Sequence, residues 1–305
     1  LGMEVRKTNL SIFNFKMKKF IKRGVFFLII TAIVSLIVGL LSVLLSKKTF
    51  DYKFKEEKNI LIVGNSHTEC SISDKILSNS VNISQSASSY FYSYIKVREF
   101  VKRNPTIDTV IVSFSDNDLF SEKERWFSST EKIRNKMTRM IFLFNKEDYL
   151  SLFYSNPLAT SLQSFILYSD FYNLYIHRRS FIGRYNQLNK NKIKESILEF
   201  NQDTPKIDYK IALTELKYLL KIYELCEKEG IHLILLNSPV HPVLQSHFSL
   251  IKDRNYKIAS EKMANATYLD HSSFKLDNSM FADLSHLNDK GSLTYSLFLK
   301  SVFGK

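Results

Sequence analysis

Short apolar runs alternate with longer amphipathic stretches along most of the chain after residue 58. Five of the runs are short, apolar and bounded by turn residues, which is typical of buried strands. They are the run ending at Gly64, Val81 to Ser84, Thr109 to Phe114, Ile231 to Leu236 and Ala266 to Leu269. Helical patterns lie between them, at Tyr90 to Arg103, Ile211 to Lys228 and Asp289 to Phe303. The alternation predicts an α/β domain with a mostly parallel sheet, whose ligands bind at the carboxyl ends of the strands.

The alternation stops between about Leu119 and Pro205. This stretch has a helical pattern and is rich in aromatic and basic side chains, including Trp126, Phe142, Tyr149 and Tyr185. One interpretation is an insertion packed on the sheet domain. The other is a cap that shapes a substrate cleft and offers Tyr, Trp and Arg to sugars or lipid headgroups. We favour the packed insertion.

A membrane span is predicted near the start of the chain. Gly24 to Ser46 is an uncharged stretch of 23 residues with no polar face, and about 20 residues suffice to cross the hydrocarbon core as a helix. The stretch is longer than the ~7–15 apolar residues of a cleaved signal peptide. No small-residue cleavage motif follows it before Lys47. We therefore expect a retained signal anchor.

The net charge of +13 is concentrated near this span. Residues 1–58 carry twelve Lys/Arg against four acidic residues, whereas the rest of the chain is close to balanced. No basic run is interleaved with aromatics, so we do not expect a nucleic-acid partner. Seven Lys/Arg precede the span and five follow it, which predicts a cytoplasmic N-terminus and an extracytoplasmic domain.

Glycine and cysteine usage narrows the function classes further. The 8 glycines are too scattered for a Walker loop or a GxGxxG turn, which excludes nucleotide binding by either device. No HxxxH or CxxC spacing occurs, so we expect neither a metal site nor a cofactor. Cys70 and Cys226 could pair outside the cytoplasm, but their spacing does not require it, and we expect two buried free thiols.

Two local motifs carry candidate chemistry. Gly64-Asn65-Ser66-His67 directly follows the first predicted strand, and Asp283-Leu284-Ser285-His286 directly precedes the last predicted helix. A serine at a strand-to-helix turn is exposed at the carboxyl edge of the sheet. An Asp three residues before a His can orient the imidazole that acts as the base of that serine. The two motifs together supply a nucleophile, a base and an orienting acid.

At these residues the sequence resembles the SGNH hydrolases, also called the GDSL lipase/esterase family. The first block, usually GDSx, is matched by Gly64 to His67 with Asn in place of Asp, and the last block, DxxH, by Asp283 and His286. The third block, GxND, is approached by Ser115-Asp116-Asn117-Asp118 without its glycine. The second block normally centres on a glycine, and the matching stretch, Ser84 to Ser89, has none.

The resemblance implies a three-layer flavodoxin-like sandwich and a role for each matching residue. Ser66 would be the nucleophile, His286 the base and Asp283 the residue that holds it. The oxyanion hole would combine the Ser66 backbone N–H, the Ala87 backbone N–H and the Asn117 side chain. The alternative from the residues alone is that Ser66 caps a helix, Asn117 lies in a turn and His286 is an ordinary polar residue.

Two further histidines are candidates for substrate contact. His67 adjoins Ser66, although packing in the first turn of the helix is equally compatible with its position. His241 follows the Ile231 to Leu236 run and would lie at the same edge of the sheet.

The expected organisation is a basic cytoplasmic segment (1–23), the anchor (24–46), a polar stalk (47–58) and an SGNH-like domain (59–305) with its helical insertion at about 119–205. The expected function is acyl ester chemistry on envelope polysaccharide or peptidoglycan, as an O-acetyltransferase or acetylesterase in the cytoplasmic membrane. Membrane-tied SGNH-like domains also imply a multispanning acyl-donor partner. The alternatives are an anchored lipase or thioesterase that acts on acyl esters of the membrane, and a binding module that kept the fold without activity.

Overall fold

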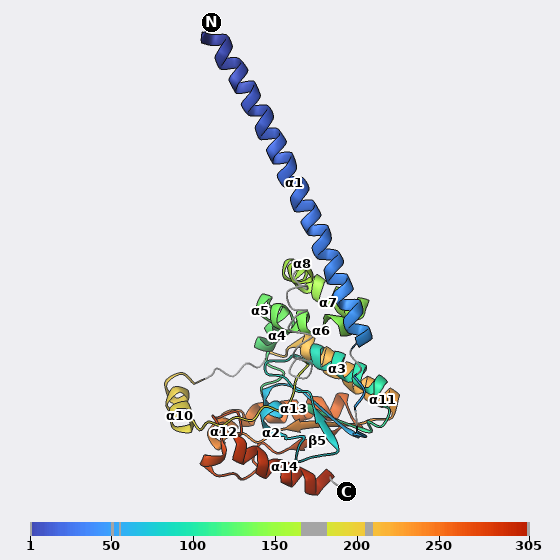
Figure 1. Cartoon of the computed structure of the whole chain (residues 1–305). Helices are drawn as coiled ribbons and strands as arrows, with labels where there is room; N and C mark the ends of the chain where they lie inside the picture. The colour runs from blue at the N-terminus through green and yellow to red at the C-terminus, as the bar shows by residue number, and fades with distance from the viewer. Residues whose placement is uncertain (1, 50–51, 55, 166–181, 205–209, 304–305) are drawn as a thin grey trace.

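A five-stranded, all-parallel sheet forms the centre of the computed structural model (Figure 1). The structure describes residues 2–49, 52–54, 56–165, 182–204 and 210–303. The strands run in the order β2-β1-β3-β4-β5, which is the flavodoxin-like order. Their bounds are Ile60–Val63 (β1), Ser80–Asn82 (β2), Thr109–Ser113 (β3), His232–Asn237 (β4) and Thr267–Asp270 (β5). The predicted α/β sandwich with a parallel sheet is confirmed.

Apolar side chains cover both faces of the sheet because successive strand residues point to opposite sides. Leu61 and Val63 of β1 join one buried cluster, together with residues of α3 (Tyr90–Arg103), α11 (Leu213–Glu229) and α13 (Ser249–Lys262). Ile60 and Ile62 join the other, with α14 (Asp289–Phe303). This arrangement makes three layers with the sheet in the middle. The remaining helices of this part of the chain are α2 (Ser66–Ser71), α12 (Pro242–His247) and the 3-10 turn η4 (Asn278–Met280).

The N-terminal helix α1 (Gly2–Thr49) extends away from the domain as a long rod (Figure 1). Its part Met17–Leu41 has a mean hydropathy of 2.8 and is long and apolar enough to span a membrane. Residues 47–58 were expected to form a polar stalk. In the structure α1 continues to Thr49, and Tyr52 is buried against Phe142. Asn104 also donates to the Tyr52 carbonyl, at 2.8 Å. The aromatic side chain of Tyr52 therefore holds the connection against the domain.

The insertion is helical over most of its described part, and it packs on the sheet domain. It comprises η1 (Ser121–Lys123), α4 (Glu124–Ser128), α5 (Thr130–Lys132), the π-helical turn η2 (Ile133–Met137), α6 (Thr138–Met140), η3 (Ile141–Leu143), α7 (Lys146–Ser155), α8 (Pro157–Phe165) and α10 (Ile193–Gln202). Residues 166–181 of the expected insertion lie outside the described residues. Helix α8 and η3 contact α1, so this part of the insertion lies beside that helix (Figure 1).

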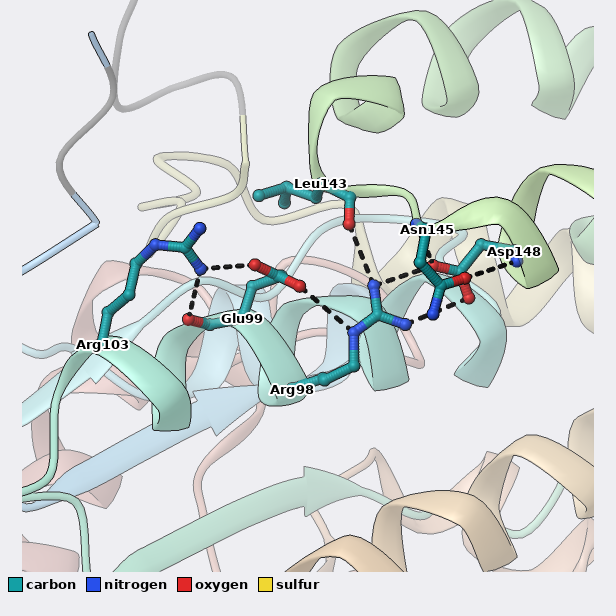
Figure 2. A network of polar contacts seen from close by, with 6 residues as sticks. All are labelled: Arg98, Glu99, Arg103, Leu143, Asn145 and Asp148. Carbon is teal, nitrogen blue, oxygen red and sulfur yellow. Dashed lines mark hydrogen bonds and ion pairs between the residues drawn. The ribbon is translucent and has the colours of Figure 1, made fainter. Parts of the chain in front are cut away.

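A polar network fastens the insertion to α3 (Figure 2). Arg98 of α3 donates to Asp148 of α7 at 2.8 Å and to the Leu143 carbonyl at 2.9 Å. Asp148 also closes a reciprocal capping box with Asn145 at the start of α7. The carboxylate is nearly inaccessible to solvent, and breaking one partner of such a buried pair is strongly destabilising. These contacts fit the packed-insertion interpretation.

The two cysteines are free and buried. Cys70 lies in α2 and Cys226 in α11, on opposite sides of the sheet. Burial raises the pKa of each thiol to about 12. The prediction of two buried free thiols is confirmed.

Candidate active site

Ser66 is the first residue of α2 because a tight turn follows β1. Gly64 has a φ of 147°, and a Cβ there would lie 2.4 Å from the Ser113 Cβ, so only glycine fits. The Asn65 side chain then accepts from the His67 N–H at 2.9 Å and caps α2. The turn leaves Ser66 partly exposed at the carboxyl edge of the sheet.

His286 joins Ser66 to Asp283. Its Nε2 lies 2.8 Å from the Ser66 Oγ, and its Nδ1 lies 2.8 Å from the Asp283 Oδ1. The loop that carries both residues is fixed by a backbone bond from Ala282 N–H to the His286 carbonyl, at 2.8 Å. The structure thus brings together, from positions 220 residues apart, the three side chains that the sequence motifs single out.

Asp283 is held in its ionised form. Burial alone would raise its pKa, but hydrogen bonds from His286 and from the Ser285 N–H, with the nearby Lys190 ammonium, lower the pKa to about 2. Lys190 lies 3.4 Å from the Asp283 Oδ2. The ionised Asp283 can only accept a hydrogen bond, so it favours the His286 tautomer with the ring proton on Nδ1. That tautomer leaves Nε2 free to accept from the Ser66 hydroxyl.

The three expected oxyanion donors follow the carboxyl ends of β1, β2 and β3, which are neighbours in the sheet. Ala87 lies in the turn after β2 and has a φ of 50°, the only positive φ among the described non-glycine residues. Asn117 lies in the turn after β3 and is partly exposed. Within the described part of the chain, the N–H groups of Ser66 and Ala87 and the Asn117 amide have no hydrogen-bond acceptor.

A buried network explains why asparagine serves at position 65. The Asn65 Nδ2 donates to the Asp118 Oδ1 at 2.7 Å, while its Oδ1 accepts from the Ser113 Oγ at 3.0 Å. The other Asp118 oxygen accepts from the Ser115 N–H at 2.7 Å and lies 3.3 Å from the Tyr90 hydroxyl. An aspartate at 65 would place a second buried carboxylate against Asp118. The asparagine supplies a donor there instead.

His67 lies next to the candidate base. Its ring centroid is 5.6 Å from that of His286. Burial, reinforced by His286 and Lys123, lowers the pKa of His67 to about 3, so the ring is neutral near pH 7. Among the described residues its buried Nδ1 has no hydrogen-bond partner. Its contact with substrate stays a prediction.

His241, the other residue predicted to contact substrate, is buried in the structure. The side chain is only 4% exposed, and its ring packs edge-on against Phe281. Its Nδ1 accepts from the Val243 N–H at 3.4 Å as the cap of α12, and its Nε2 lies 3.1 Å from the Asn278 Oδ1. Both ring nitrogens are therefore used inside the fold, and none is left for a ligand.

A segment that carries no recognisable motif crosses the site. Residues 182–192 run without helical structure from the loop after β2 to the last block. Their backbone bonds include Arg184 N–H to the Ser84 carbonyl (3.1 Å) and Lys192 N–H to the Ala282 carbonyl (2.8 Å). This crossing segment also supplies Lys190. Backbone bonds of this kind leave no pattern in the sequence that could have located it.

Insertion residues line a small cavity beside the turn that carries Ser66. The cavity has a volume of about 10 Å³, room for roughly one water molecule. Lys123 and Trp126 of the insertion line it, with the Lys123 ammonium 3.7 Å from the Trp126 ring centroid. Its other walls are Gly64, Asn65, Ser88, Tyr90, Asp118 and Glu215. Within the residues that the structure describes, no group of three His, Cys, Asp or Glu could hold a metal ion.

Three solved structures show distant similarity to this chain. An acylhydrolase from Bacteroides fragilis NCTC 9343 is 11% identical, with 82% of this chain and 88% of that chain covered and a TM-score of 0.38. A GDSL-like lipase from Bacteroides thetaiotaomicron VPI-5482 is 12% identical, with 84% and 93% covered and a TM-score of 0.39. A structure from Streptococcus pneumonia described as a platelet activating factor is 12% identical, with 87% and 90% covered and a TM-score of 0.42.

Sequence comparisons add little to this similarity. A protein-family model matches residues 200–305, and no curated protein matches the chain. The sheet has the flavodoxin-like strand order, and Ser66, Asp283 and His286 meet at its carboxyl edge. The expected three-layer α/β architecture is therefore confirmed.

Proposed function

We propose that this SGNH-like chain is a serine-dependent acyl ester enzyme with Ser66 as nucleophile, His286 as base and Asp283 as the residue that orients the base. The observation that carries the proposal is the single imidazole within 2.8 Å of both the Ser66 hydroxyl and the Asp283 carboxylate. A helix-capping serine does not need a histidine partner that is itself held by an ionised carboxylate. The arrangement is the one that nucleophilic acyl transfer requires.

In the first half of the reaction the Ser66 Oγ attacks the ester carbonyl, and its proton passes to Nε2 of His286. Asp283 stabilises the imidazolium that forms. The Ser66 N–H, the Ala87 N–H and the Asn117 amide donate to the oxyanion. The tetrahedral intermediate then breaks its bond to the alcohol, which leaves with the proton from His286.

In the second half a hydroxyl group attacks the acyl-Ser66 ester and gives its proton to His286. Water as the attacking group gives hydrolysis, and a sugar hydroxyl gives acyl transfer. Collapse of the second intermediate returns the proton to Ser66. The same residues thus serve both outcomes, and the acceptor decides between them.

We further propose that the acyl group is short and that the alcohol is a glycan of the cell envelope. The insertion interleaves its aromatic side chains with Arg, Lys, Asn and Gln, a mixture suited to stacking and hydrogen bonding with sugars. Helix α1 would also hold the domain close to the membrane, where exported glycans pass. An O-acetyltransferase or acetylesterase fits both features.

A lipid ester is the second candidate substrate. Tyr154 of α7 and Leu158 of α8 are 76% and 80% exposed, and α8 contacts α1. Apolar side chains beside a membrane anchor favour contact with the bilayer, which would bring lipid acyl esters close to the domain. A lipase or thioesterase would use the same three catalytic residues.

The proposed location is the outer side of the cytoplasmic membrane, with α1 as a single span. The excess of Lys/Arg before the span supports this orientation. A multispanning protein that delivers acyl groups across the membrane would be the partner of a transferase. An alkaline phosphatase fused to the C-terminus should be active in cells, and an active cytoplasmic reporter at that position would contradict both the orientation and the envelope substrate.

Intact-mass spectrometry tests the nucleophile. The detergent-solubilised full chain, incubated with an aryl acetate, should gain the mass of one acetyl group, and Ser66→Ala should gain none. Asn117→Ala is the matched variant that keeps the nucleophile and should acetylate slowly. An adduct of equal yield in Ser66→Ala would remove Ser66 from the mechanism, and no turnover by any form would leave the non-catalytic binding module.

The substrate class is tested in cells and in solution. Deletion of the protein should change the acetyl content of purified surface polysaccharide or peptidoglycan, measured by NMR. Ser66→Ala should reproduce the change if the chemistry is responsible. An unchanged acetyl profile together with efficient cleavage of long-chain esters would favour the lipase.

A further inference from the structure

Two buried lysines donate to the loop that carries Ala87. Lys96 of α3 is fully buried, and its Nζ lies 2.8 Å from the Ile83 carbonyl. Lys136 of η2 is 6% exposed, and its Nζ lies 2.6 Å from the Ser86 carbonyl. Burying an ammonium is costly, so a lysine in such a position needs a compensating partner. Each lysine finds it in a carbonyl of the loop after β2.

The carbonyl that Lys136 contacts belongs to the peptide group between Ser86 and Ala87. The N–H of that same peptide group is the Ala87 N–H, because one amide plane holds both. A cation on the oxygen of an amide draws electron density from its nitrogen and strengthens the N–H as a donor. Among the described residues the Ala87 N–H has no acceptor, so a ligand is free to use it.

We propose that Lys136 is a positioning residue of the oxyanion hole, which holds the Ser86–Ala87 peptide in place and polarises its N–H toward the developing oxyanion. The inference rests on the proposed acyl ester function. It gives the helical insertion a part in the chemistry, although the insertion supplies no member of the Ser66, His286 and Asp283 set. Lys96 contacts a different peptide group and serves only to hold the loop.

The surroundings of Lys136 make its charge dependent on pH. Burial lowers the pKa of Lys136 to about 7, with Glu69 of α2 opposing the shift and Lys132 and Arg139 adding to it. Lys96 of α3 also lies within electrostatic reach. Below pH 7 the protonated lysine donates to the Ser86 carbonyl, and above it the charge is lost. The contribution of Lys136 to the rate should therefore fall as the pH rises through about 7.

Steady-state kinetics of the full chain in detergent micelles tests the proposal. A whole oxyanion donor is worth about 10²–10³ in kcat, and weakening one by removal of its polarising charge should cost about tenfold. Lys136→Met should lower kcat by that factor at pH 6 with KM unchanged, and the ratio of wild-type to Lys136→Met kcat should fall toward one as the pH rises through about 7. Lys96→Met is the matched control, since it removes the neighbouring lysine but should keep the pH profile of wild type.

Three kinetic outcomes are distinguishable. If wild type does not turn over, the proposed function fails and the kinetics cease to bear on Lys136. If wild type is active and Ser66→Ala is not, but Lys136→Met keeps both kcat and the pH profile, the role of Lys136 is overturned alone. Equal losses in both lysine variants with unchanged pH profiles would also overturn it, in favour of loop holding.

Nuclear magnetic resonance supplies a measurement that needs no catalysis. In ¹⁵N-alanine-labelled Ser66→Ala, the Ala87 amide proton should shift with a midpoint near pH 7. The same signal should stay flat in Ser66→Ala combined with Lys136→Met. A flat Ala87 signal in Ser66→Ala itself would overturn the polarising contact, and this result decides the matter even if Lys136→Met does not fold.

Discussion

The two halves of the candidate site are held in different ways. Ser66, His286 and Asp283 sit on short turns directly at the ends of β1 and before α14, so the core of the domain fixes them. The loop after β2, with Ala87, is held by Lys96 of the core helix α3, by the insertion residue Lys136 and by the close approach of Gly183. A Cβ at Gly183 would lie 2.2 Å from the Ile83 carbonyl. The three candidate catalytic side chains therefore rest mainly on the core, whereas Ala87 also depends on the insertion and the crossing segment.

The largest effect on the rate is expected from a substitution in the core half of the site, Asp283→Asn. In Asp283→Asn the imidazole of His286 would favour the wrong tautomer, with its proton on Nε2. We expect kcat to fall about 10⁴-fold, which corresponds to about 5.5 kcal/mol, with the fold kept. Turnover of an aryl acetate and circular dichroism measure the two parts of this expectation.

Asp277→Asn is the control for that variant. Asp277 likewise accepts from a backbone N–H two residues on, that of Ser279 at 2.8 Å, but it has no histidine partner. Its variant should keep the wild-type rate. A similar loss in both variants would mean that loop structure, and not the tautomer of His286, explains the effect.

Lowering the pH should reduce the stability of the folded chain through His67, which lies beside Ser66 in the same half of the site. The folded chain keeps His67 neutral down to about pH 3, whereas an unfolded histidine takes up a proton near pH 6.5. The unfolded state therefore binds more protons between these values, and stability falls as the pH falls. The loss attributable to His67 should reach about 4 kcal/mol at pH 3.5. In guanidinium unfolding between neutral pH and pH 3.5, wild type should lose about 4 kcal/mol more stability than His67→Gln, and parallel curves would contradict this role.

Local sequence signals were sufficient to predict the elements and residues of the core half of the site. The helix Tyr90–Arg103 is found at the predicted residues because Asn104-Pro105 ends it. The helix Asp289–Phe303 starts as predicted because the Asn288 side chain accepts from the N–H groups of Lys290 and Gly291, each at 3.1 Å. Ser66 and His286 were found because their motifs lie at such element ends.

Long-range contacts explain what the sequence did not predict. Lys136 contacts the Ser86 carbonyl, and Lys190 contacts the Asp283 carboxylate. Both partners are distant in the sequence, and a single lysine gives no sequence pattern from which such a partner could be predicted. The second strand ends at Asn82, two residues early, because the Asn82 side chain accepts from the Ser84 N–H. The capping role of His241 in α12 was not predicted, although Pro242 after it is a common sign of a helix start.

Asn65 lies between the two halves of the site, and adding one negative charge there should lower the stability of the fold. Asn65→Asp would set a second carboxylate against Asp118 in a buried place, and one of the two would have to keep a proton. We expect a loss of about 1–3 kcal/mol at pH 7. The folded pKa of the pair would be raised, so stability should recover as the pH falls toward 5. Asn59→Asp is the control, because Asn59 donates to Asp108 at 3.3 Å in a solvent-accessible place. Equal losses in the two variants would exclude burial as the cause.

The smallest effect is expected in the outer half, at Ala87. A left-handed conformation costs an alanine about 1–2 kcal/mol, and glycine adopts it freely but loses about 0.5–1 kcal/mol more backbone entropy on folding. Ala87→Gly should therefore stabilise the chain by about 0.5–1 kcal/mol, measured by guanidinium unfolding. The rate should change less than about twofold, because glycine keeps the N–H that we propose as an oxyanion donor. Ala264→Gly, at an exposed position without a positive φ, should instead destabilise slightly. If Ala87→Gly also destabilised the chain, the loop would not be strained at Ala87. Its shape would then follow from Lys136 and the crossing segment alone.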